Sequence, residues 1–407
     1  MKCRHCGSAL RCDFLDLGFA PPSNAYLAAE DLSKPEVYFP LRLKVCEECW
    51  LVQTEDYASA ESLFSPEYAY FSSASSSWLA HAARYVEMIT RRLGLGQQSM
   101  VIEVASNDGY LLKNFVAAGI PCLGVEPTDS TAEAAEKLGI PVLREFFGEA
   151  LGKRLADESK GADLILGNNV YAHVPDINDF TKGIKAALKA GGTVTLEFPH
   201  VMRLIEQNQF DTVYHEHFSY LSLFTVGKIF ESAGLRVFDV EELPTHGGSL
   251  RVYGCHADDP RQTTDAVTTL LAEEETRGLR SSAVYADFQV KAEKVKNDAL
   301  AFLIEAKRAG KTVAAYGAAA KGNTLLNFAG VKPDLVPFVC DAAAAKQNKF
   351  MPGSHIPILH PDVISERRPD YVLILPWNIA TEVRQQLATL AEQGTKFVTA
   401  VPDLKIQ

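Results

Sequence analysis

Three consecutive titratable side chains between two aromatic residues form the part of the chain best suited to acid–base chemistry. Residues 214–218 read Tyr-His-Glu-His-Phe. Removing a proton beside a carbonyl needs a base, a group that orients it and a donor for the enolate oxygen, and these side chains have those abilities. A zinc-protease site requires His-Glu-x-x-His, which this run is not. The alternative is a polar loop whose imidazoles bond to backbone groups.

A loop suited to a nucleotide-like cofactor lies earlier in the chain. Residues 103–109 read Glu-Val-Ala-Ser-Asn-Asp-Gly, between an expected strand at 100–104 and a helix. Small residues let the backbone approach a ligand, and the free N–H groups of a helix start face it. The loop lacks the Gly-x-Gly-x-x-Gly of a pyrophosphate cradle, so S-adenosylmethionine, which has no phosphate, is favoured over NAD or a degenerate site.

Further cofactor contacts are expected at the ends of neighbouring strands. Glu126 ends the strand expected at 121–126 and is predicted to accept hydrogen bonds from the ribose hydroxyls. Phe146 and Phe147 are predicted to sandwich the adenine, with burial in the core as the alternative. The other predicted cofactor-binding residues are Glu103, Ala105, Ser106, Asn107, Asp108, Gly109, Pro127, Asn168 and Asn169.

Four of the eight cysteines form two Cys-x-x-Cys pairs near the start of the chain. Cys3 with Cys6 and Cys46 with Cys49 can place four thiolates around one tetrahedral ion. This spacing predicts a structural zinc rather than reduced cysteines without metal. Four protein ligands close the site, so the zinc is expected to support folding and to take no part in chemistry.

Alternating strand and helix patterns predict an α/β fold with parallel sheets. Strands are expected at 100–104, 121–126, 162–166 and 193–198, and again at 312–316, 336–341 and 371–375. A charged helical stretch from about 261 to 307 is expected to brace the two α/β units. The expected domains are 1–65 (zinc-binding), 66–255 (S-adenosylmethionine-binding) and 256–407 (helical connector and nucleotide-fold unit).

Composition and charge exclude several classes of protein. A net charge of −11 without a long basic run makes nucleic acid an unsuitable partner. No apolar stretch reaches the roughly twenty residues of a membrane span, and the N-terminus has no apolar signal region. We expect a cytoplasmic, soluble protein that has no membrane partner.

Several motifs in order give the whole chain a resemblance to a known family. They are the two Cys-x-x-Cys pairs, Tyr-x-Tyr-Phe-Ser-Ser from Tyr68, residues 103–109, Tyr-His-Glu-His from Tyr214, Thr-His-Gly-Gly-Ser-Leu-Arg ending at Arg251, and residues 316–324. The chain resembles three-domain sugar C-methyltransferases that act on nucleotide-linked 4-keto-6-deoxyhexoses. The resemblance implies a zinc-binding N-terminal domain, a central Rossmann-like class I methyltransferase domain and a C-terminal Rossmann-like α/β domain that helps to hold a nucleotide-diphosphate sugar.

The same resemblance implies roles for individual residues. It makes His217 the base, with Tyr214, Glu216 and His173 as further catalytic residues. The substrate pocket implied by the family includes Tyr68, Tyr70, Phe71 and Ser72. The C-terminal loop departs from the antibiotic-pathway enzymes by reading Ala-Lys-Gly-Asn-Thr, which leaves the sugar and the nucleotide base open.

The chemistry that this resemblance implies can be weighed against the residues, and it has rivals. Lys321 lies in a strand-to-helix turn, where a lysine and helix N–H groups can hold a diphosphate with help from Asn323 and Thr324; a solvated surface lysine is the alternative. A 4-keto group acidifies the hydrogen on carbon 3, and a neutral histidine can remove it. O- or N-methylation of a small molecule and non-catalytic binding of a nucleotide sugar are the competing functions.

Overall fold

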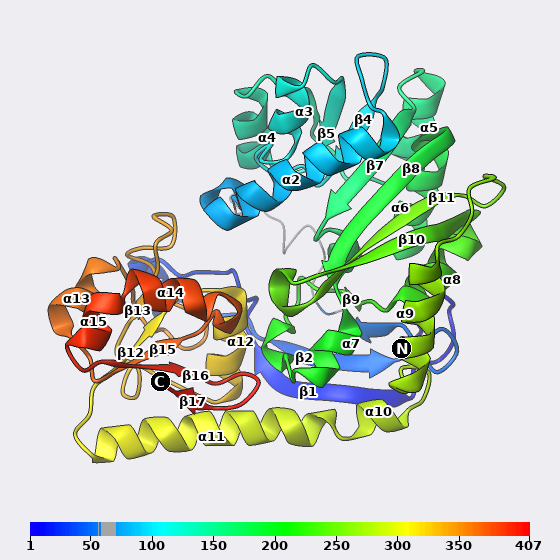
Figure 1. Cartoon of the computed structure of the whole chain (residues 1–407). Coiled ribbons are helices and arrows are strands. Elements are labelled where there is room, and N and C mark those ends of the chain that lie inside the picture. Colours follow the sequence, from blue (N-terminus) through cyan, green and yellow to red (C-terminus); the bar gives the residue numbers. More distant parts are fainter. Residues whose placement is uncertain (56, 58–70) are drawn as a thin grey trace.

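The computed structural model describes residues 1–55, 57 and 71–407, and these residues contain three β-sheets (Figure 1). Two of the predicted substrate residues, Tyr68 and Tyr70, lie outside the described residues. Among the described residues, no helix combines the length and apolar character needed to cross a membrane.

The N-terminal sheet is antiparallel and takes its fourth strand from far along the chain. Its order is β1-β2-β3-β9. The strands are β1 (Cys12–Ala20), β2 (Phe39–Val45), β3 (Val52–Thr54) and β9 (Ser219–Tyr220). Val52 pairs with Tyr220 and Gln53 with Ser219. The polar run at 214–218 is therefore anchored directly to the cysteine-containing module.

A seven-stranded sheet of order β10-β11-β8-β7-β4-β5-β6 forms the centre of the molecule. Strands β4 to β8 are parallel to one another. β10 and β11 form an antiparallel hairpin that pairs with β8. The strands are β4 (Val101–Val104), β5 (Cys122–Val125), β6 (Val142–Leu143), β7 (Ala162–Asn168), β8 (Leu188–Pro199), β10 (Leu235–Leu243) and β11 (Ser249–His256). The four predicted strands are confirmed, although β8 begins before residue 193 because Leu188 already pairs with Ala162 ahead of a register shift.

Helices cover both faces of this sheet and link its strands. They are α2 (Ser76–Leu93), α3 (Leu112–Ala117), α4 (Asp129–Glu136), α5 (Glu149–Asp157), α6 (Ile177–Ala187), α7 (Val201–Glu206) and α8 (Leu223–Ala233). Short 3-10 turns are η1 (Ala29–Ser33), η2 (Ser72–Ala74), η3 (Tyr171–His173), η4 (Phe210–Thr212) and η5 (Thr245–Gly247). Most of these turns lie at strand ends or between domains, where polar side chains collect.

The predicted helical brace is confirmed as α9 (Asp265–Thr276), α10 (Ala283–Ala286) and α11 (Phe288–Arg308). With 21 residues, α11 is about 30 Å long and runs beneath the molecule from the N-terminal sheet to the C-terminal unit (Figure 1). At one end, the Phe288 ring lies 4.7 Å from that of Phe14 in β1. At the other end, the Phe302 ring lies 5.1 Å from that of Tyr371. Its two ends therefore pack on different sheets.

The C-terminal unit is a second α/β domain with sheet order β14-β13-β12-β15-β16-β17. Its strands are β12 (Val313–Tyr316), β13 (Val339–Cys340), β14 (Ile358–Leu359), β15 (Tyr371–Ile374), β16 (Lys396–Thr399) and β17 (Lys405–Ile406). Its helices are α12 (Ala320–Phe328), α13 (Asp362–Arg367), η6 (Trp377–Ile379), α14 (Ala380–Gln386) and α15 (Ala388–Glu392). The predicted mixed α/β architecture with Rossmann-like units is thus observed.

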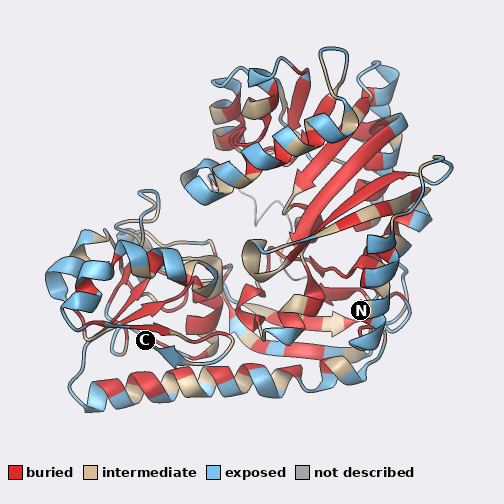
Figure 2. Cartoon of the chain, viewed as in Figure 1, coloured by how far each residue is buried: buried red, intermediate tan, exposed pale blue. Residues whose placement is uncertain are grey.

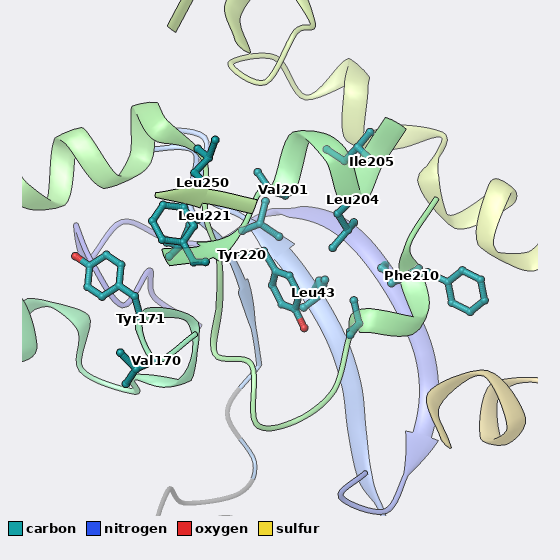
Figure 3. Close-up of a cluster of buried hydrophobic side chains, with 14 of the residues drawn as sticks. Leu43, Val170, Tyr171, Val201, Leu204, Ile205, Phe210, Tyr220, Leu221 and Leu250 are labelled. Carbon is teal, nitrogen blue, oxygen red and sulfur yellow. The ribbon is translucent and has the colours of Figure 1, made fainter. Parts of the chain in front are cut away.

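Buried residues concentrate in the strands and on the inner faces of the helices (Figure 2). One apolar cluster joins the N-terminal sheet to the central domain (Figure 3). Leu43 of β2, Tyr220 of β9 and Leu204 of α7 belong to it. Because this cluster is continuous, the loop before β9 is held between two domains rather than on one.

Candidate active site

The three central residues of the 214–218 run point to three different partners. The imidazole of His215 lies 3.2 Å from the Pro40 carbonyl of the N-terminal module. The amide of Asn24 donates to both carboxylate oxygens of Glu216, at 2.9 and 2.7 Å. His217 instead packs between Tyr214, with ring centroids 4.0 Å apart, and His173, at 4.5 Å. The side chains of His215 and Glu216 anchor the loop. Of the three residues, only His217 contacts the other predicted catalytic residues, Tyr214 and His173.

Backbone carbonyls orient the two paired imidazoles. The Thr212 carbonyl acts to raise the pKa of the His217 imidazole, and the Glu216 carbonyl acts to raise that of His173, so each ring has a backbone acceptor beside it. In a neutral imidazole the second nitrogen then carries a lone pair. The sequence suggested that the Glu216 side chain orients an imidazole. In the structure, the backbone carbonyls of Glu216 and Thr212 take that position instead. A neutral His217 ring can thus present a lone pair to a substrate.

Burial keeps these histidines neutral. It lowers the pKa of His217 well below the ordinary value, and the neighbouring His173 adds to this shift. Burial likewise lowers the pKa of His173 to about 4. A charged imidazole loses its hydration when it is buried, so the neutral form is favoured. At neutral pH, His217 can accept a proton.

The loop at 103–109 gathers carboxyl groups without a basic partner. Burial, with the negative charges of Asp108 and Glu126, raises the pKa of Glu103 well above its ordinary value. Among the described residues, none of these three acids forms an ion pair. S-adenosylmethionine carries positive sulfonium and ammonium groups, so a cluster of unpaired acids suits it and repels the pyrophosphate of NAD.

Backbone geometry and unpaired polar atoms also fit a ligand at this loop. Ala105 and Asn107 have φ angles of 56° and 50°, in the left-handed region, and a Cβ on Gly109 would lie 2.4 Å from Ile140. Within the described part of the chain, several buried side-chain atoms lack a hydrogen-bond partner. They are Oε2 of Glu103, Oγ of Ser106, Oδ1 of Asp108 and both polar atoms of Asn168. Bound S-adenosylmethionine would be held by this loop at the ends of β4 and β7.

Other predicted cofactor residues have defined surroundings. The Glu126 carboxylate accepts the backbone N–H groups of Asn107, at 2.9 Å, and Thr128, at 3.0 Å, so it ties the loop to the end of β5 just before Pro127. The Phe147 ring lies 5.4 Å from that of Phe180. Phe146 is 54% exposed. Phe147 therefore packs on α6. That Phe146 and Phe147 sandwich the adenine stays a prediction.

The segment before α2 is bonded to the cofactor loop. The Ser72 N–H donates to Oδ1 of Asn107 at 2.9 Å, and the Ser73 N–H donates to Oδ2 of Asp108 at 3.0 Å. Phe71 directly precedes these contacts and is 36% exposed. This places Phe71 and Ser72, predicted to line the substrate pocket, beside the predicted methyl donor.

The C-terminal unit brings Lys321 toward the histidines. Its ammonium donates to Oδ1 of Asn378 at 2.7 Å and lies 4.7 Å from the Trp377 ring centroid. Its positive charge contributes to the lowered pKa of His217. Asn323 and Thr324 are buried and donate to the carbonyls of Ser23, at 3.2 Å, and Val213, at 2.8 Å. Their donors thus join α12 to the N-terminal module and to the His217 loop.

A second buried network was missed by sequence reasoning. Glu197, fully buried near the end of β8, accepts from Arg251 at 2.7 Å and Thr245 at 3.0 Å and contacts His81 at 2.9 Å. Burial opposes ionisation of Glu197, but His81 and Arg251 outweigh it and hold its pKa below the ordinary value. A carboxylate at the end of a predicted strand and the adjacent glycines at 247–248 were the available signals.

The four cysteines converge on one point. Their sulfur atoms lie within 4.8 Å of one another, with Cys3 and Cys49 at 3.6 Å and Cys6 and Cys46 at 3.4 Å. A tetrahedral Zn–S₄ centre with bonds of about 2.3 Å places its sulfurs about 3.8 Å apart. The Gln53 amide contacts the Cys3 sulfur at 3.3 Å. These residues fit a structural zinc.

Comparisons with known proteins match three domain models to successive parts of the chain. A zinc domain model described as "Putative zinc binding domain" matches residues 3–64, a methyltransferase domain model matches 78–240, and a C-methyltransferase C-terminal domain model matches 244–402. The C-methyltransferase NovU of Streptomyces niveus is 35% identical over 405 residues, covering 100% of this chain and 96% of NovU. The chain belongs to the C-methyltransferase family. It is an S-adenosylmethionine-dependent C-methyltransferase with a zinc-binding module.

More distant similarities are confined to part of the chain. An uncharacterized methyltransferase of Mycobacterium leprae is 30% identical over 99 residues, which is 24% of this chain and 36% of that protein. The structure of magnesium protoporphyrin IX methyltransferase from Synechocystis has a TM-score of 0.33 and 13% identity, covering 44% of this chain and 80% of that one. A methyltransferase structure from Anabaena variabilis has a TM-score of 0.36 and 14% identity, with coverages of 44% and 85%.

Membership of this family decides between the competing functions. Transfer to carbon excludes the O- and N-methylation alternative and a purely binding role.

Replacing Cys46 by serine is expected to reduce zinc content and to lower activity together with stability. β3 of the metal module pairs with β9, which follows His217, so loosening the module displaces the base. Metal analysis, thermal unfolding and methyl transfer would be measured. Cys12→Ser, at a cysteine outside the cluster, is the control. Less than one zinc per wild-type chain, or full activity of a zinc-free Cys46 variant, would contradict this expectation.

Replacing Glu126 by alanine is expected to weaken S-adenosylmethionine binding roughly 10- to 150-fold, because a charged hydrogen-bond acceptor is worth about 1.5–3 kcal/mol. The loss has two sources, the predicted ribose contact and the freed Asn107 N–H of the loop. Titration calorimetry measures the affinity. Glu133→Ala, at an exposed position on α4, should bind as the wild type does. Unchanged affinity in the Glu126 variant would remove it from the cofactor site.

Proposed function

We propose that this C-methyltransferase acts on carbon 3 of a nucleotide-linked 4-keto-6-deoxy sugar. The observation that carries the proposal is His217, a buried imidazole packed between Tyr214 and His173, whose pKa burial lowers so that the ring is neutral. Its lone pair is available beside Tyr214 and His173. A base of this kind forms a carbon nucleophile only if the C–H bond is acidified, and an adjacent ketone does so.

The proposed chemistry assigns a separate task to each residue. His217 takes the proton from carbon 3, and the electrons of the C–H bond form a double bond to carbon 4 as the ketone oxygen becomes an enolate. Tyr214 donates a hydrogen bond to that oxygen. His173 packs edge-on against His217 and limits its movement. Bound S-adenosylmethionine supplies an electrophilic methyl group, and His217 afterwards releases its proton to solvent.

Anchoring residues keep this arrangement fixed. Glu216 is bonded to Asn24, and Thr324 of α12 is bonded to Val213, one residue before Tyr214. The loop is therefore tied to the N-terminal module and to the C-terminal unit at once. Holding base and donor in place supplies acceleration because the reacting groups need no further ordering.

Lys321 supports a nucleotide-sugar substrate. Carbon 1 of such a sugar carries the diphosphate and lies two bonds from carbon 3, so a cation that holds the diphosphate must lie close to the base. Lys321, at the start of α12, is suited to this role because its charge contributes to lowering the pKa of His217. Asp211, whose pKa burial raises to about 6, and Asn378 keep the ammonium in position. We assign Asn323 and Thr324 to positioning of α12.

Replacing His217 by asparagine should lower turnover roughly 100- to 10,000-fold, the usual range for loss of a positioned base. The assay is hydrogen–deuterium exchange at carbon 3 with S-adenosylhomocysteine in place of the methyl donor. Wild type should exchange and the variant should not, while S-adenosylmethionine still binds. His256→Asn is the control, because that imidazole also bonds a backbone carbonyl but lies outside the site.

The pH dependence of the same exchange gives a second readout for His217. Because the pKa of its imidazole is lowered, the neutral form persists below pH 6.5, and the acid limb of the wild-type rate should lie below that value. Rapid exchange by the His217→Asn variant would transfer the role of base to His173.

Replacing Lys321 by alanine should raise the Michaelis constant for the nucleotide sugar about 10-fold or more, because a charged contact to the diphosphate is lost. Binding of S-adenosylmethionine should be unaffected. The exposed Lys311, which pairs with Asp370 on the opposite end of β12, provides the Lys311→Ala control. A Lys321 variant with the wild-type Michaelis constant would show that the contact does not exist.

A further inference from the structure

The turn between β10 and β11 holds a histidine in an unfavourable backbone conformation. His246 has a φ angle of 54°, in the left-handed region, and Gly247 and Gly248 follow with φ angles of 89° and 117°. For a residue with a Cβ, this conformation is less stable than the right-handed helical one by roughly 1–2 kcal/mol. Such a residue persists only where its surroundings hold it, and strain of this kind concentrates at functional sites.

Contacts from several elements hold the turn. The Thr245 hydroxyl donates to Oε1 of Glu197 at 3.0 Å, and the Gln209 amide donates to the Gly247 carbonyl at 2.7 Å. A Cβ on Gly247 would lie 2.5 Å from the Trp377 ring, so the C-terminal unit closes over the turn. The His246 ring packs against Trp78, with centroids 5.2 Å apart. The turn is thus fixed by β8, η4, α2 and η6 together.

The hydrogen bond of His246 is the reverse of those made by the other two histidines. His217 and His173 each have a backbone carbonyl among the groups that act on their pKa, and a carbonyl can only accept, so the other nitrogen of a neutral ring keeps a lone pair. The amide nitrogen of Asn169, in contrast, donates to Nε2 of His246 at 2.9 Å. A neutral imidazole whose Nε2 accepts carries its hydrogen on Nδ1. Among the described residues, no hydrogen bond uses Nδ1 of His246.

His246 also lies between the parts of the active site. Asn169 follows β7, at the edge where the methyl donor is predicted to bind. The charge of Lys321 lowers the pKa of both His246 and His217, which places the two imidazoles within reach of the same ammonium. Burial is the main cause that lowers the pKa of His246, to about 4, so its ring is neutral at pH 7.

We propose that His246 is a catalytic hydrogen-bond donor, whose Nδ1–H binds the substrate's ketone oxygen and stabilises the negative charge that develops there. This assignment rests on the proposed ketone chemistry and deepens it. No proton is transferred from His246: the C–H electrons move toward the oxygen, the proton goes to His217, and the imidazole N–H remains bonded to its own ring. Tyr214 and His246 then form a two-donor site for the enolate oxygen.

The test replaces His246 by glycine, which adopts the left-handed conformation without strain and so preserves the turn. Exchange at carbon 3 in the presence of S-adenosylhomocysteine should fall roughly 100- to 1,000-fold, the range for one lost oxyanion donor. The Michaelis constant should change much less than the rate, because the contact strengthens as charge develops. His355→Gly is the matched control, because His355 is also left-handed, with a φ angle of 57°, and bonds Glu36 outside the site.

A second variant tests the tautomer itself. Asn169→Asp presents only acceptor oxygens, so a neutral His246 must place its hydrogen on Nε2 and lose the Nδ1–H donor, whereas a doubly protonated ring would keep it. Nitrogen NMR of histidine-labelled enzyme should show an Nδ1-protonated His246 in wild type and the opposite tautomer in the variant. Exchange should fall with this switch, and titration of S-adenosylmethionine separates it from any loss of cofactor binding.

The outcomes distinguish this inference from the proposed function. Wild-type enzyme that exchanges no hydrogen in any 4-keto nucleotide sugar would overturn the proposed function. Wild-type exchange accompanied by undiminished exchange in His246→Gly would overturn the role of His246 alone. An Nε2-protonated His246 in wild type, or rescue of His246→Gly by free imidazole acting as a base, would also overturn the donor assignment.

Discussion

The pairing of β3 with β9 is the contact on which the active site depends. Val52 and Gln53 of the cysteine module pair with Tyr220 and Ser219, so a two-residue strand fixes the loop that carries His217. A module this short has little core of its own, and a zinc held by four cysteines supplies the missing stability. We therefore expect the metal to influence catalysis through backbone pairing, at a distance from the chemistry.

Once the loop is fixed, each neutral histidine has a single proton to place, and the group beside it decides where. The carbonyls near His217 and His173 can only accept, which leaves a lone pair on the other nitrogen, whereas the amide of Asn169 leaves an N–H on His246. Burial then lowers each pKa and keeps the rings neutral. One residue type can therefore provide both the proposed base and a proposed hydrogen-bond donor within one site.

Charge is separated across the same site. The cofactor loop gathers Glu103, Asp108 and Glu126, which favour a cationic methyl donor. The C-terminal unit contributes Lys321, held by Asn378 and the Trp377 ring, which suits an anionic part of the substrate. Because α12 is also bonded to Val213 beside the catalytic loop, the third domain both carries this charge and helps to position the base.

Local patterns in the sequence determined the two Cys-x-x-Cys pairs, the strand–turn–helix at 103–109, four strands of the central α/β unit with three of the C-terminal one, and the polar run at 214–218. Each depends on residues close together in the chain, so spacing and periodicity suffice to find it. Only the tertiary structure showed that Glu216 bonds Asn24, 192 residues away, that Asn323 and Thr324 join domains, and that Glu197, Arg251 and His246 lie at the site. The role of a polar side chain depends on which partner takes its hydrogen bond, and here those partners come from other domains, where no local pattern specifies them.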